Sequence, residues 1–325
     1  MRVLIVKTSS MGDVVHALPA VTDIATHVPG AAIDWVIEQQ FAEIPRLHRH
    51  VGDVIPVALR RWRSQLHLPS TWSQIRTSRR VLREFRYDQI LDLQGLVKSA
   101  MLARWANGPV AGPCGRSARE RAAAWFYDRR ISVDPALHAI DRHRQLAASA
   151  FGYTLDSKVD FGIRVPPLGA AVLRPWIGEQ RFALLLTNAS RASKLWPDEN
   201  WLATEEWLAE QGLASVLVWG SERERAETTR RAARMHAARV APAAGLDTLA
   251  AVCERAALVI GLDTGLTHWA AAVGAPTVGI FCDYDPAQVG LKADERRVNL
   301  GGVADSPSSE DVIDAARHVL AAAAG

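Results

Sequence analysis

The sequence predicts an α/β protein with two Rossmann-like domains that face each other across a cleft. Strand and helix patterns alternate through the first half of the chain, which is typical of a parallel sheet covered by helices. A second alternating series follows in the other half. Between the two series, residues 161–170 read FGIRVPPLGA, and the Pro-Pro pair and the glycines are typical of a linker. We therefore expect domains at 1–165 and 166–307, followed by a C-terminal helix within 308–325.

Each predicted element of the first half rests on its hydrophobic pattern. Short apolar runs predict strands at 2–6, 32–37, 54–57 and 88–92. Helical spacing predicts helices at 13–28, 71–85, 97–106, 117–128 and 134–154. This order of elements is that of βαβ units, so we expect the strands to be parallel.

The second half follows the same logic. Strands are expected at 182–187, 214–220, 257–262 and 276–281. Helices are expected at 197–211, 222–236, 266–274 and 308–324. Because ligands of open parallel sheets bind at the carboxyl ends of the strands, the loops after these strands are the place to look for a site.

The composition is that of a folded protein for which we expect a cytoplasmic location. Of 325 residues, 49% are hydrophobic and 22% are charged, which allows two packed cores and argues against disorder. No apolar run has the length of a bilayer span, and MRVLIV at the N-terminus leads into a polar turn, unlike a signal peptide. Cys114, Cys253 and Cys282 stand far apart, so we interpret them as buried or idle thiols.

The two halves differ in charge. Residues 1–165 hold 23 Lys and Arg against 15 Asp and Glu, whereas residues 166–325 hold 15 against 20. Between 58 and 86, one acid, Glu84, stands among eight arginines: Arg60, Arg61, Arg63, Arg76, Arg79, Arg80, Arg83 and Arg86. Guanidinium groups suit carboxylates and phosphates, and a basic amphipathic segment also suits an anionic membrane surface. A solvated arginine face is the alternative, and no recognition motif supports nucleic acid.

The most informative motif is VIGLDTGLTHWAAAVGAPTVGIF, residues 259–281. After its strand, Asp263, Thr264 and Gly265 turn into a helix whose free N–H groups suit a diphosphate. Thr264 and His268 are four residues apart and hence on one face of that helix. Asp263 should repel phosphate, so we assign it to sugar hydroxyls. The alternative is an ordinary N-cap at Asp263 and a buried helix histidine.

Two further loops of the same half follow strands and carry polar groups. TNASRASKLWP contains Lys194, a candidate phosphate clamp, and Ser190, a candidate hydrogen-bond donor. WGSERERA offers Glu222 or Glu224 to ribose hydroxyls. Each could be a solvated side chain, but three such loops together indicate a nucleotide-diphosphate site. The chain has no GxGxxG and no Walker A loop, which disfavours a dehydrogenase or a P-loop kinase.

Two acidic positions need a separate interpretation. VLIVKTSSMGDVVHALP passes from a strand to a helix through a turn that carries Asp13. A helix N-terminus favours anions, so this carboxylate either caps the helix or takes part in chemistry. The DYD at 283–285 could bind a metal ion, but its Pro-containing loop is typical of a turn, so we expect no metal site.

Taken together, five motifs resemble those of the lipopolysaccharide heptosyltransferases, glycosyltransferase family 9, and within it the heptosyltransferase I group. They are VKTSSMGDVVHALP, DLQGLVKSA, FYDRR, SKLWP and DTGLTHWAAAVGAPTVGIF, in order over nearly the whole chain. The resemblance implies a GT-B fold whose last helix crosses back to the first domain. It also implies inverting heptose transfer from ADP-L-glycero-β-D-manno-heptose to a Kdo residue of Kdo2-lipid A, in inner-core biosynthesis. The implied location is the cytoplasmic face of the inner membrane, as a peripheral protein that requires no cofactor.

The resemblance also assigns roles to residues. Asp13 is the expected general base for the acceptor hydroxyl, and Lys194 is expected to stabilise the departing diphosphate. The implied donor-binding residues are Ala189, Ser190, Lys194, Glu224, Asp263, Thr264, Gly265 and His268. The acceptor side is expected to include Arg60, Arg61, Arg63 and Lys98, with Arg119 and Arg142 as further basic candidates. The family often has paired threonines where this chain has Ala189-Ser190, so one expected hydroxyl is missing.

Two other functions stay open at this point. A later heptosyltransferase adds to a heptose acceptor instead of Kdo, and DLQGLVKSA and the arginine run favour the first transfer. A protein that only binds a nucleotide sugar or lipid A is the other alternative. Asp13, Lys194 and Asp263 argue against it, because a binder needs no base.

Overall fold

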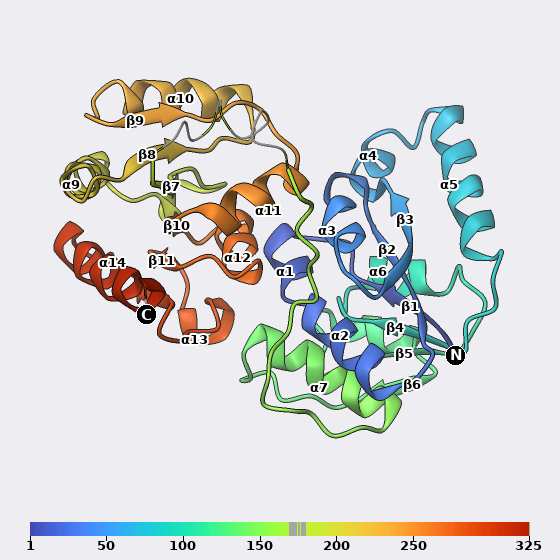
Figure 1. Cartoon of the computed structure of the whole chain (residues 1–325). Helices are drawn as coiled ribbons and strands as arrows, with labels where there is room; N and C mark the ends of the chain where they lie inside the picture. The colour runs from blue at the N-terminus through green and yellow to red at the C-terminus, as the bar shows by residue number, and fades with distance from the viewer. Residues whose placement is uncertain (169–173, 175, 177–179, 325) are drawn as a thin grey trace. The chain divides into compact units, whose positions relative to one another are not determined.

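The computed structural model describes residues 1–168, 174, 176 and 180–324. The chain divides into two compact units, Met1–Arg164 and Val165–Gly325 (Figure 1). Part of the predicted linker, residues 169 and 170, lies outside the described residues. Both units are Rossmann-like, as the sequence predicts, while their expected arrangement across a cleft stays a prediction.

The first unit is a six-stranded parallel sheet with the order β3-β2-β1-β4-β5-β6. Its strands are β1 (Arg2–Val6), β2 (Ala32–Glu38), β3 (Val51–Val57), β4 (Gln89–Asp92), β5 (Val110–Pro113) and β6 (Arg129–Ile131). Its α-helices are α1 (Met11–Val15), α2 (Leu18–His27), α3 (Glu43–Arg46), α4 (Leu59–Ser64), α5 (Pro69–Leu82), α6 (Val97–Ala103) and α7 (Ala139–Phe151). Two 3-10 helices are η1 (Gln39–Phe41) and η2 (Arg121–Phe126). The strand order reverses between β1 and β4, and ligands of such sheets bind beside this switch point.

The second unit repeats this order as β12-β11-β10-β7-β8-β9, with its switch point between β7 and β10. The strands are β7 (Phe182–Leu186), β8 (Ala214–Leu217), β9 (Ala238–Val240), β10 (Leu258–Leu262), β11 (Thr277–Phe281) and β12 (Arg297–Gly301). The helices are η3 (Ala192–Lys194), α9 (Asp198–Glu210), α10 (Glu222–Ala232), α11 (Leu246–Arg255), α12 (Gly265–Ala272), α13 (Pro286–Val289) and α14 (Ser309–Ala324).

Helices cover both faces of each sheet, which explains why the strands read as continuous apolar runs. In β7, Phe182 and Leu184 belong to one core and Ala183 and Leu185 to the other, because successive side chains of a strand point to opposite faces. The C-terminal helix α14 packs on α9 and β11. It buries Val312, Ala316 and Val319 in the second unit, so its expected return to the first domain stays a prediction.

Some element predictions were wrong. The helix expected at 13–28 is two helices, α1 and α2, and the second starts afresh at Leu18-Pro19, where proline lacks the N–H of a helix interior. The helix expected at 117–128 is instead η2, followed closely by β6. Strands β5, β6, β9 and β12 and helix α11 were not predicted. The first three of these strands have three or four residues each, too few for a hydrophobic pattern to show.

Candidate functional site

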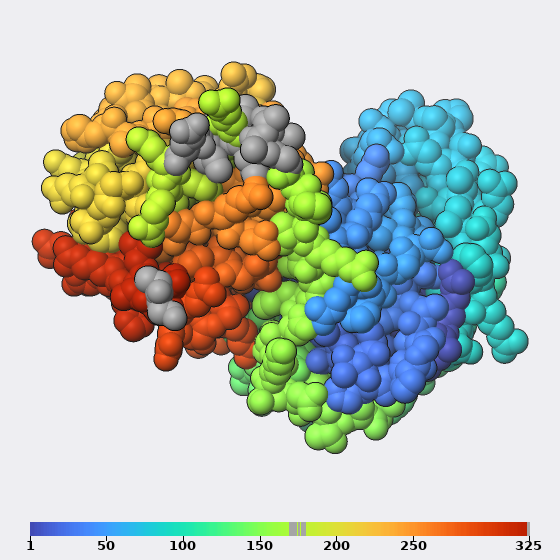
Figure 2. Space-filling model, in the orientation of Figure 1, coloured from blue at the N-terminus to red at the C-terminus, as the bar shows by residue number. Residues whose placement is uncertain are grey.

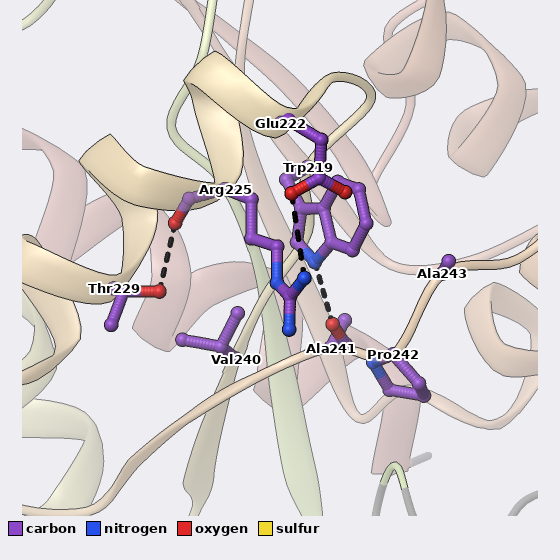
Figure 3. A pocket seen from close by; sticks show the side chains of 8 residues that line it. All are labelled: Trp219, Glu222, Arg225, Thr229, Val240, Ala241, Pro242 and Ala243. Atoms are coloured by element: carbon purple, nitrogen blue, oxygen red, sulfur yellow. Dashed lines mark hydrogen bonds and ion pairs between the residues drawn. The ribbon is translucent and has the colours of Figure 1, made fainter.

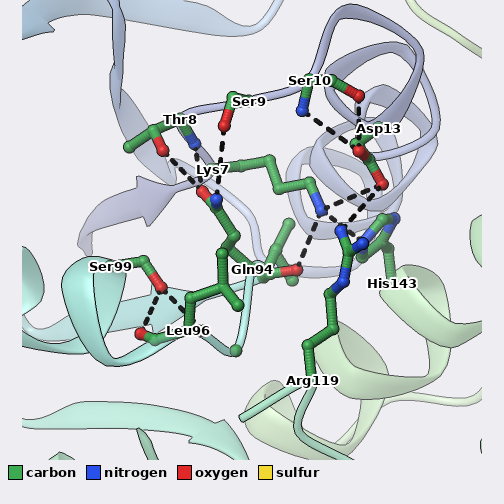
Figure 4. Close-up of polar contacts among 12 residues, drawn as sticks. Lys7, Thr8, Ser9, Ser10, Asp13, Gln94, Leu96, Ser99, Arg119 and His143 are labelled. Atoms are coloured by element: carbon green, nitrogen blue, oxygen red, sulfur yellow. Dashed lines mark hydrogen bonds and ion pairs between the residues drawn. The ribbon is translucent and has the colours of Figure 1, made fainter. Parts of the chain in front are cut away.

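The candidate residues of the first unit gather at its switch point, where the loops after β1 and β4 meet. The side chain of Gln94 joins the two loops, because its Oε1 accepts hydrogen bonds from the backbone N–H and the hydroxyl of Thr8, both at 2.7 Å (Figure 4). Asp92 holds the second loop from within, accepting from the N–H groups of Gln94 (2.8 Å) and Gly95 (3.2 Å) and from Ser99 Oγ (2.8 Å). This fixed loop pair is the frame in which Asp13 lies.

Asp13 both caps helix α1 and faces a cluster of cations. Its Oδ2 accepts from the N–H of Ser10 at 3.1 Å and from the Ser10 hydroxyl at 2.6 Å. Its Oδ1 lies 3.9 Å from Lys7 Nζ and 3.7 Å from an amino nitrogen of Arg119, beyond hydrogen-bond distance (Figure 4). One oxygen therefore serves the fold while the other remains able to accept a proton.

Burial and charge act in opposite directions on this carboxyl. Burial raises the pKa of Asp13, but the Lys7 ammonium, the Ser10 hydrogen bonds and Arg119 together hold it well below its usual range. Lys7 is 2% exposed, and burial lowers its pKa. Its Nζ contacts His143 Nε2 at 3.3 Å, and burial and the nearby ammonium lower the pKa of His143 to about 3. A neutral imidazole thus accepts from a buried ammonium, which in turn keeps Asp13 ionised.

The structure joins some of the predicted acceptor residues and separates others. Arg119 contacts Asp13, and burial and the nearby Arg119 lower the pKa of Arg142, whose guanidinium donates to the Pro135 carbonyl at 2.9 Å. Lys98 is an exposed residue of α6. The remaining predicted residues are exposed on α4: Arg60, Arg61 and Arg63.

Helix α4 is itself fixed at the carboxyl end of β2. The carboxylate of Glu38 accepts from the N–H groups of Leu59 (3.0 Å) and Arg60 (2.8 Å), the first two residues of the helix. Anions stabilise a helix N-terminus, so this buried acid explains why the helix starts there. The arginines of α4 accordingly stand on the same edge of the sheet as Asp13.

The second unit places an ion pair at its switch point. Lys194, after β7, donates to the Asp263 carboxylate and, at 3.3 Å, to the Asp263 carbonyl oxygen. His268 Nε2 lies 3.4 Å from Asp263 Oδ1. Burial raises the pKa of Asp263, yet the contacts with His268 and Lys194 lower it overall. The predicted donor residues Lys194, Asp263 and His268 therefore form one cluster.

Helix α12 begins at this cluster. Its N-cap is Thr264 and its first residue is Gly265, so the alternative of an N-cap at Asp263 was wrong. The Thr264 hydroxyl lies 3.4 Å from that of Thr267, and Thr264 and Gly265 are partly exposed. The hydroxyl and the first N–H groups of α12 thus stand beside the Lys194 ammonium, a combination that suits a phosphate.

The other predicted donor residues lie on neighbouring loops. Ser190 is exposed and Ala189 is half-buried. Glu224 Oε2 accepts from the Gly220 N–H at 2.7 Å and so closes the turn before α10. In the DYD segment, Asp285 caps α13 and Asp283 accepts from the Ser193 hydroxyl at 2.9 Å. Within the described ranges, no group of three or more His, Cys, Asp or Glu side chains could hold a metal ion.

A pocket opens at the carboxyl ends of β8 and β9, beside the N-terminal part of α10 (Figure 3). Its lining is Trp219, Glu222, Arg225, Thr229, Val240, Ala241, Pro242 and Ala243. Trp219 Nε1 donates to the Ala241 carbonyl at 2.6 Å, which fixes the indole, and the Arg225 guanidinium lies 5.4 Å from the centre of that ring. An aromatic face beside an arginine can hold a flat, polar ring such as a nucleobase.

Several residues of the site were not predicted. Lys7 and Gln94 lie within two of the quoted motifs, but their roles depend on contacts across the sheet. His143 comes from α7, 136 residues from Lys7. A signal for Lys7 did exist: a lysine directly after four buried strand residues has no route to solvent and therefore needs partners.

Comparisons with known proteins find similar sequences and structures. The family model described as glycosyltransferase family 9 (heptosyltransferase) matches residues 75–313. Lipopolysaccharide heptosyltransferase 1 of Pseudomonas aeruginosa is 41% identical over 303 residues, covering 93% of this chain and 84% of that protein. The structure of E. coli heptosyltransferase WaaC with ADP superposes with a TM-score of 0.87 at 35% identity, covering 97% of this chain and 98% of the other. The same enzyme with ADP-2-deoxy-2-fluoro heptose gives a TM-score of 0.84 at the same identity and coverage.

Proposed function

Because the chain belongs to glycosyltransferase family 9, the heptosyltransferases, and has a GT-B fold, we propose that it builds the lipopolysaccharide inner core. The proposed reaction is transfer of L-glycero-D-manno-heptose from ADP-L-glycero-β-D-manno-heptose to a Kdo residue of Kdo2-lipid A. The similarity to a curated heptosyltransferase 1 supports the reaction type. The observation that carries the acceptor assignment is the cation-lined carboxylate Asp13 at the first switch point, which suits a base acting on an anionic sugar.

The second unit is the proposed donor site. The adenine ring would lie in the pocket beside Trp219. Glu224, in the first turn of α10, would accept from the ribose hydroxyls. Lys194, the Thr264 hydroxyl and the N–H of Gly265 would hold the diphosphate and stabilise the charge that develops as ADP leaves. We propose that these groups replace a metal ion. Asp263, with His268 beside it, would accept from heptose hydroxyls once Lys194 turns toward the diphosphate.

Asp13 is the proposed general base of a single inverting displacement. Its depressed pKa keeps the carboxylate ionised at neutral pH, so no proton has to leave before the reaction starts. A weak base is sufficient if the proton moves late, because the acceptor hydroxyl becomes acidic as its oxygen bonds to the anomeric carbon. Oδ1 would take that proton, while Oδ2 stays bound to Ser10.

The acceptor and the membrane complete the proposal. Arg119 and Arg142 would bind the Kdo carboxylates beside Asp13, and Arg60, Arg61, Arg63 and Lys98 the more distant anionic groups. None of the helices in the described ranges combines the length and the apolar character needed to cross a bilayer. We propose peripheral attachment to the cytoplasmic face of the inner membrane, where the lipid-linked acceptor would be reached.

The test is a transfer assay with ADP-heptose and Kdo2-lipid A stripped of its acyl chains, on wild type and Asp13→Asn. We expect transfer by the wild type and a loss of about 10²- to 10⁴-fold in the variant, with ADP affinity unchanged. A variant as fast as the wild type removes Asp13 from the chemistry. Transfer only to an acceptor that already carries heptose indicates the later enzyme, and no transfer with bound ADP-heptose indicates a binding protein.

A further inference from the structure

Helix α5 of the first unit presents an almost wholly basic face to solvent. Residues 72, 76, 79, 80 and 83 fall within about a quarter of the helix circumference at 3.6 residues per turn. All five are exposed: Trp72, Arg76, Arg79, Arg80 and Arg83. This set is called the α5 basic face below. It is about 16 Å long at 1.5 Å per residue, longer than a single phosphate or carboxylate requires.

Apolar residues outside the basic face fix α5 to the unit. Ile75, Val81 and Leu82 pack into the core of the first unit, and α5 lies against the edge strand β3 (Figure 1). The Gln74 side chain accepts from Trp62 Nε1 and from Arg61, both at 3.0 Å, which joins α4 to α5. In the space-filling view, α5 forms an open outer surface of the first unit (Figure 2). The basic face is therefore a rigid part of the fold.

An apolar cluster lies at the N-terminal end of this face. Leu66, Leu68 and Trp72 are 48%, 37% and 50% exposed, unlike the nearby Trp62, which is buried. Trp72 Nε1 donates to the Leu66 carbonyl at 2.8 Å, so the polar atom of the indole is already satisfied. A tryptophan with a satisfied N–H and an exposed ring suits the boundary between lipid headgroups and acyl chains.

Among the residues that the structure describes, the arginines of this face have no anionic partner. Within the described ranges, none of the four forms an ion pair, and the hydrogen bonds that two of them donate go to neutral carbonyls: Arg76 to Trp72 and Arg83 to Trp105, both at 3.2 Å. Like charges three and four residues apart on a helix repel one another. An extended anionic partner would relieve this repulsion, and charge complementarity together with the apolar cluster favours a lipid surface over a soluble polyanion.

We propose that the α5 basic face and the cluster Leu66, Leu68 and Trp72 dock the first unit onto an anionic lipid bilayer. The arginines pair with lipid phosphates, and the three apolar side chains enter the headgroup boundary. The inference rests on the proposed function for its biological setting, a lipid-linked acceptor. It is separable from transfer, because Arg76, Arg79 and Arg83 are outside the donor and acceptor residues named above.

Vesicle co-sedimentation of the full chain tests the proposal. The variants are the triple variant Arg76→Glu, Arg79→Glu, Arg83→Glu and the single variant Trp72→Ala. The matched control makes the same charge change on exposed positions of the second unit: Arg223→Glu, Arg230→Glu, Arg317→Glu. Wild type and control should bind phosphatidylcholine–phosphatidylglycerol vesicles, and binding should weaken with salt. The triple variant should bind at least about 100-fold more weakly, since each basic residue contributes about 1 kcal/mol, and Trp72→Ala should bind several-fold more weakly.

Transfer to the acyl-free acceptor separates this inference from the proposed function. Loss of vesicle binding with unchanged transfer, and unchanged circular dichroism, supports the docking surface. Wild-type binding no tighter to anionic than to pure phosphatidylcholine vesicles overturns it, whatever the transfer assay gives. A triple variant that binds vesicles normally but loses transfer to the soluble acceptor also overturns it, and assigns these arginines to the acceptor.

Discussion

The two units share one strand order and place different chemistry at the same topological point. At the first switch point, the carboxylate Asp13 lies among cations, one of which, Lys7, is buried and cannot leave. At the second, the cation Lys194 is 15% exposed and rests on Asp263. The strand order determines where the loops meet. The residues after each strand determine whether a carboxylate or an ammonium group is held in place there. This difference fits the proposed roles, a fixed base in the first unit and a releasable phosphate clamp in the second.

The largest expected effect is on the free energy of unfolding, and it tests whether the two units unfold independently. Asp23 of α2 and Arg144 of α7 form a buried bidentate pair in the first unit, at 2.7 and 3.1 Å. Asp23→Ala leaves the guanidinium without its carboxylate and should lower the free energy of unfolding of that unit by about 3 to 5 kcal/mol, measured by urea denaturation. Asp314→Ala, which breaks an exposed pair with Arg317, should cost less than about 1 kcal/mol. In Asp23→Ala, ADP affinity should be unchanged at urea concentrations below the unfolding transition. An equal loss of unfolding free energy in Asp23→Ala and Asp314→Ala contradicts the expectation.

The second prediction concerns the clamp. Lys194→Met removes the proposed charge-assisted contact to the diphosphate and leaves Asp263 with His268 alone, so the Kd for ADP should rise by about 10- to 100-fold. Isothermal titration calorimetry with ADP measures this. Lys98→Met, an exposed lysine of the first unit, is the matched control and should bind ADP like the wild type. If both variants lose ADP affinity equally, the assignment of ADP binding to the second unit is wrong.

Much of the fold could be predicted from sequence because most of the strands that line the two switch points are buried apolar runs. The place of Asp13, Lys194 and Asp263 at the ligand-binding edge could also be predicted, since each lies on the segment that follows such a strand. The contacts that set their behaviour could not be predicted. Lys7 and His143 are 136 residues apart, and Arg119 reaches Asp13 through a loop after a strand too short to detect. Such pairings depend on sheet order, which local patterns do not encode.

A pH profile tests the buried cation of the first unit. In the wild type, the depressed pKa of Asp13 leaves this proposed base ionised across neutral and mildly acidic pH, so its protonation should not slow transfer at about pH 5. Removing an opposite charge at this distance raises a carboxyl pKa by about 1 to 3 units. In Lys7→Met, transfer should therefore begin to fall at a pH about 1 to 3 units higher than in the wild type, which lowers the ratio of transfer at pH 5 to transfer at pH 8. Arg119→Met, at an exposed residue, should shift the profile less.

An unchanged ratio in Lys7→Met shows that Lys7 supports the fold without holding the charge of Asp13. If Arg119→Met displaces the pH profile as much as Lys7→Met does, the two cations act together on Asp13. The buried cation then has no larger effect than the exposed one.

The smallest effect concerns which carboxylate of the second unit meets the ribose. Glu224→Gln keeps an oxygen that can accept from the Gly220 N–H, so the turn before α10 should persist while the charge is lost. We expect Glu224→Gln to weaken the binding free energy of ADP and of adenosine by about 1 kcal/mol, which is roughly a five-fold rise in Kd. The Kd for pyrophosphate should not change. Glu222→Gln, two residues away and already paired with Arg225, is the matched control. If Glu222→Gln alone weakens the binding of adenosine, the ribose lies on the pocket side of α10. If Glu224→Gln weakens the binding of pyrophosphate as well, the role of Glu224 is not limited to the ribose.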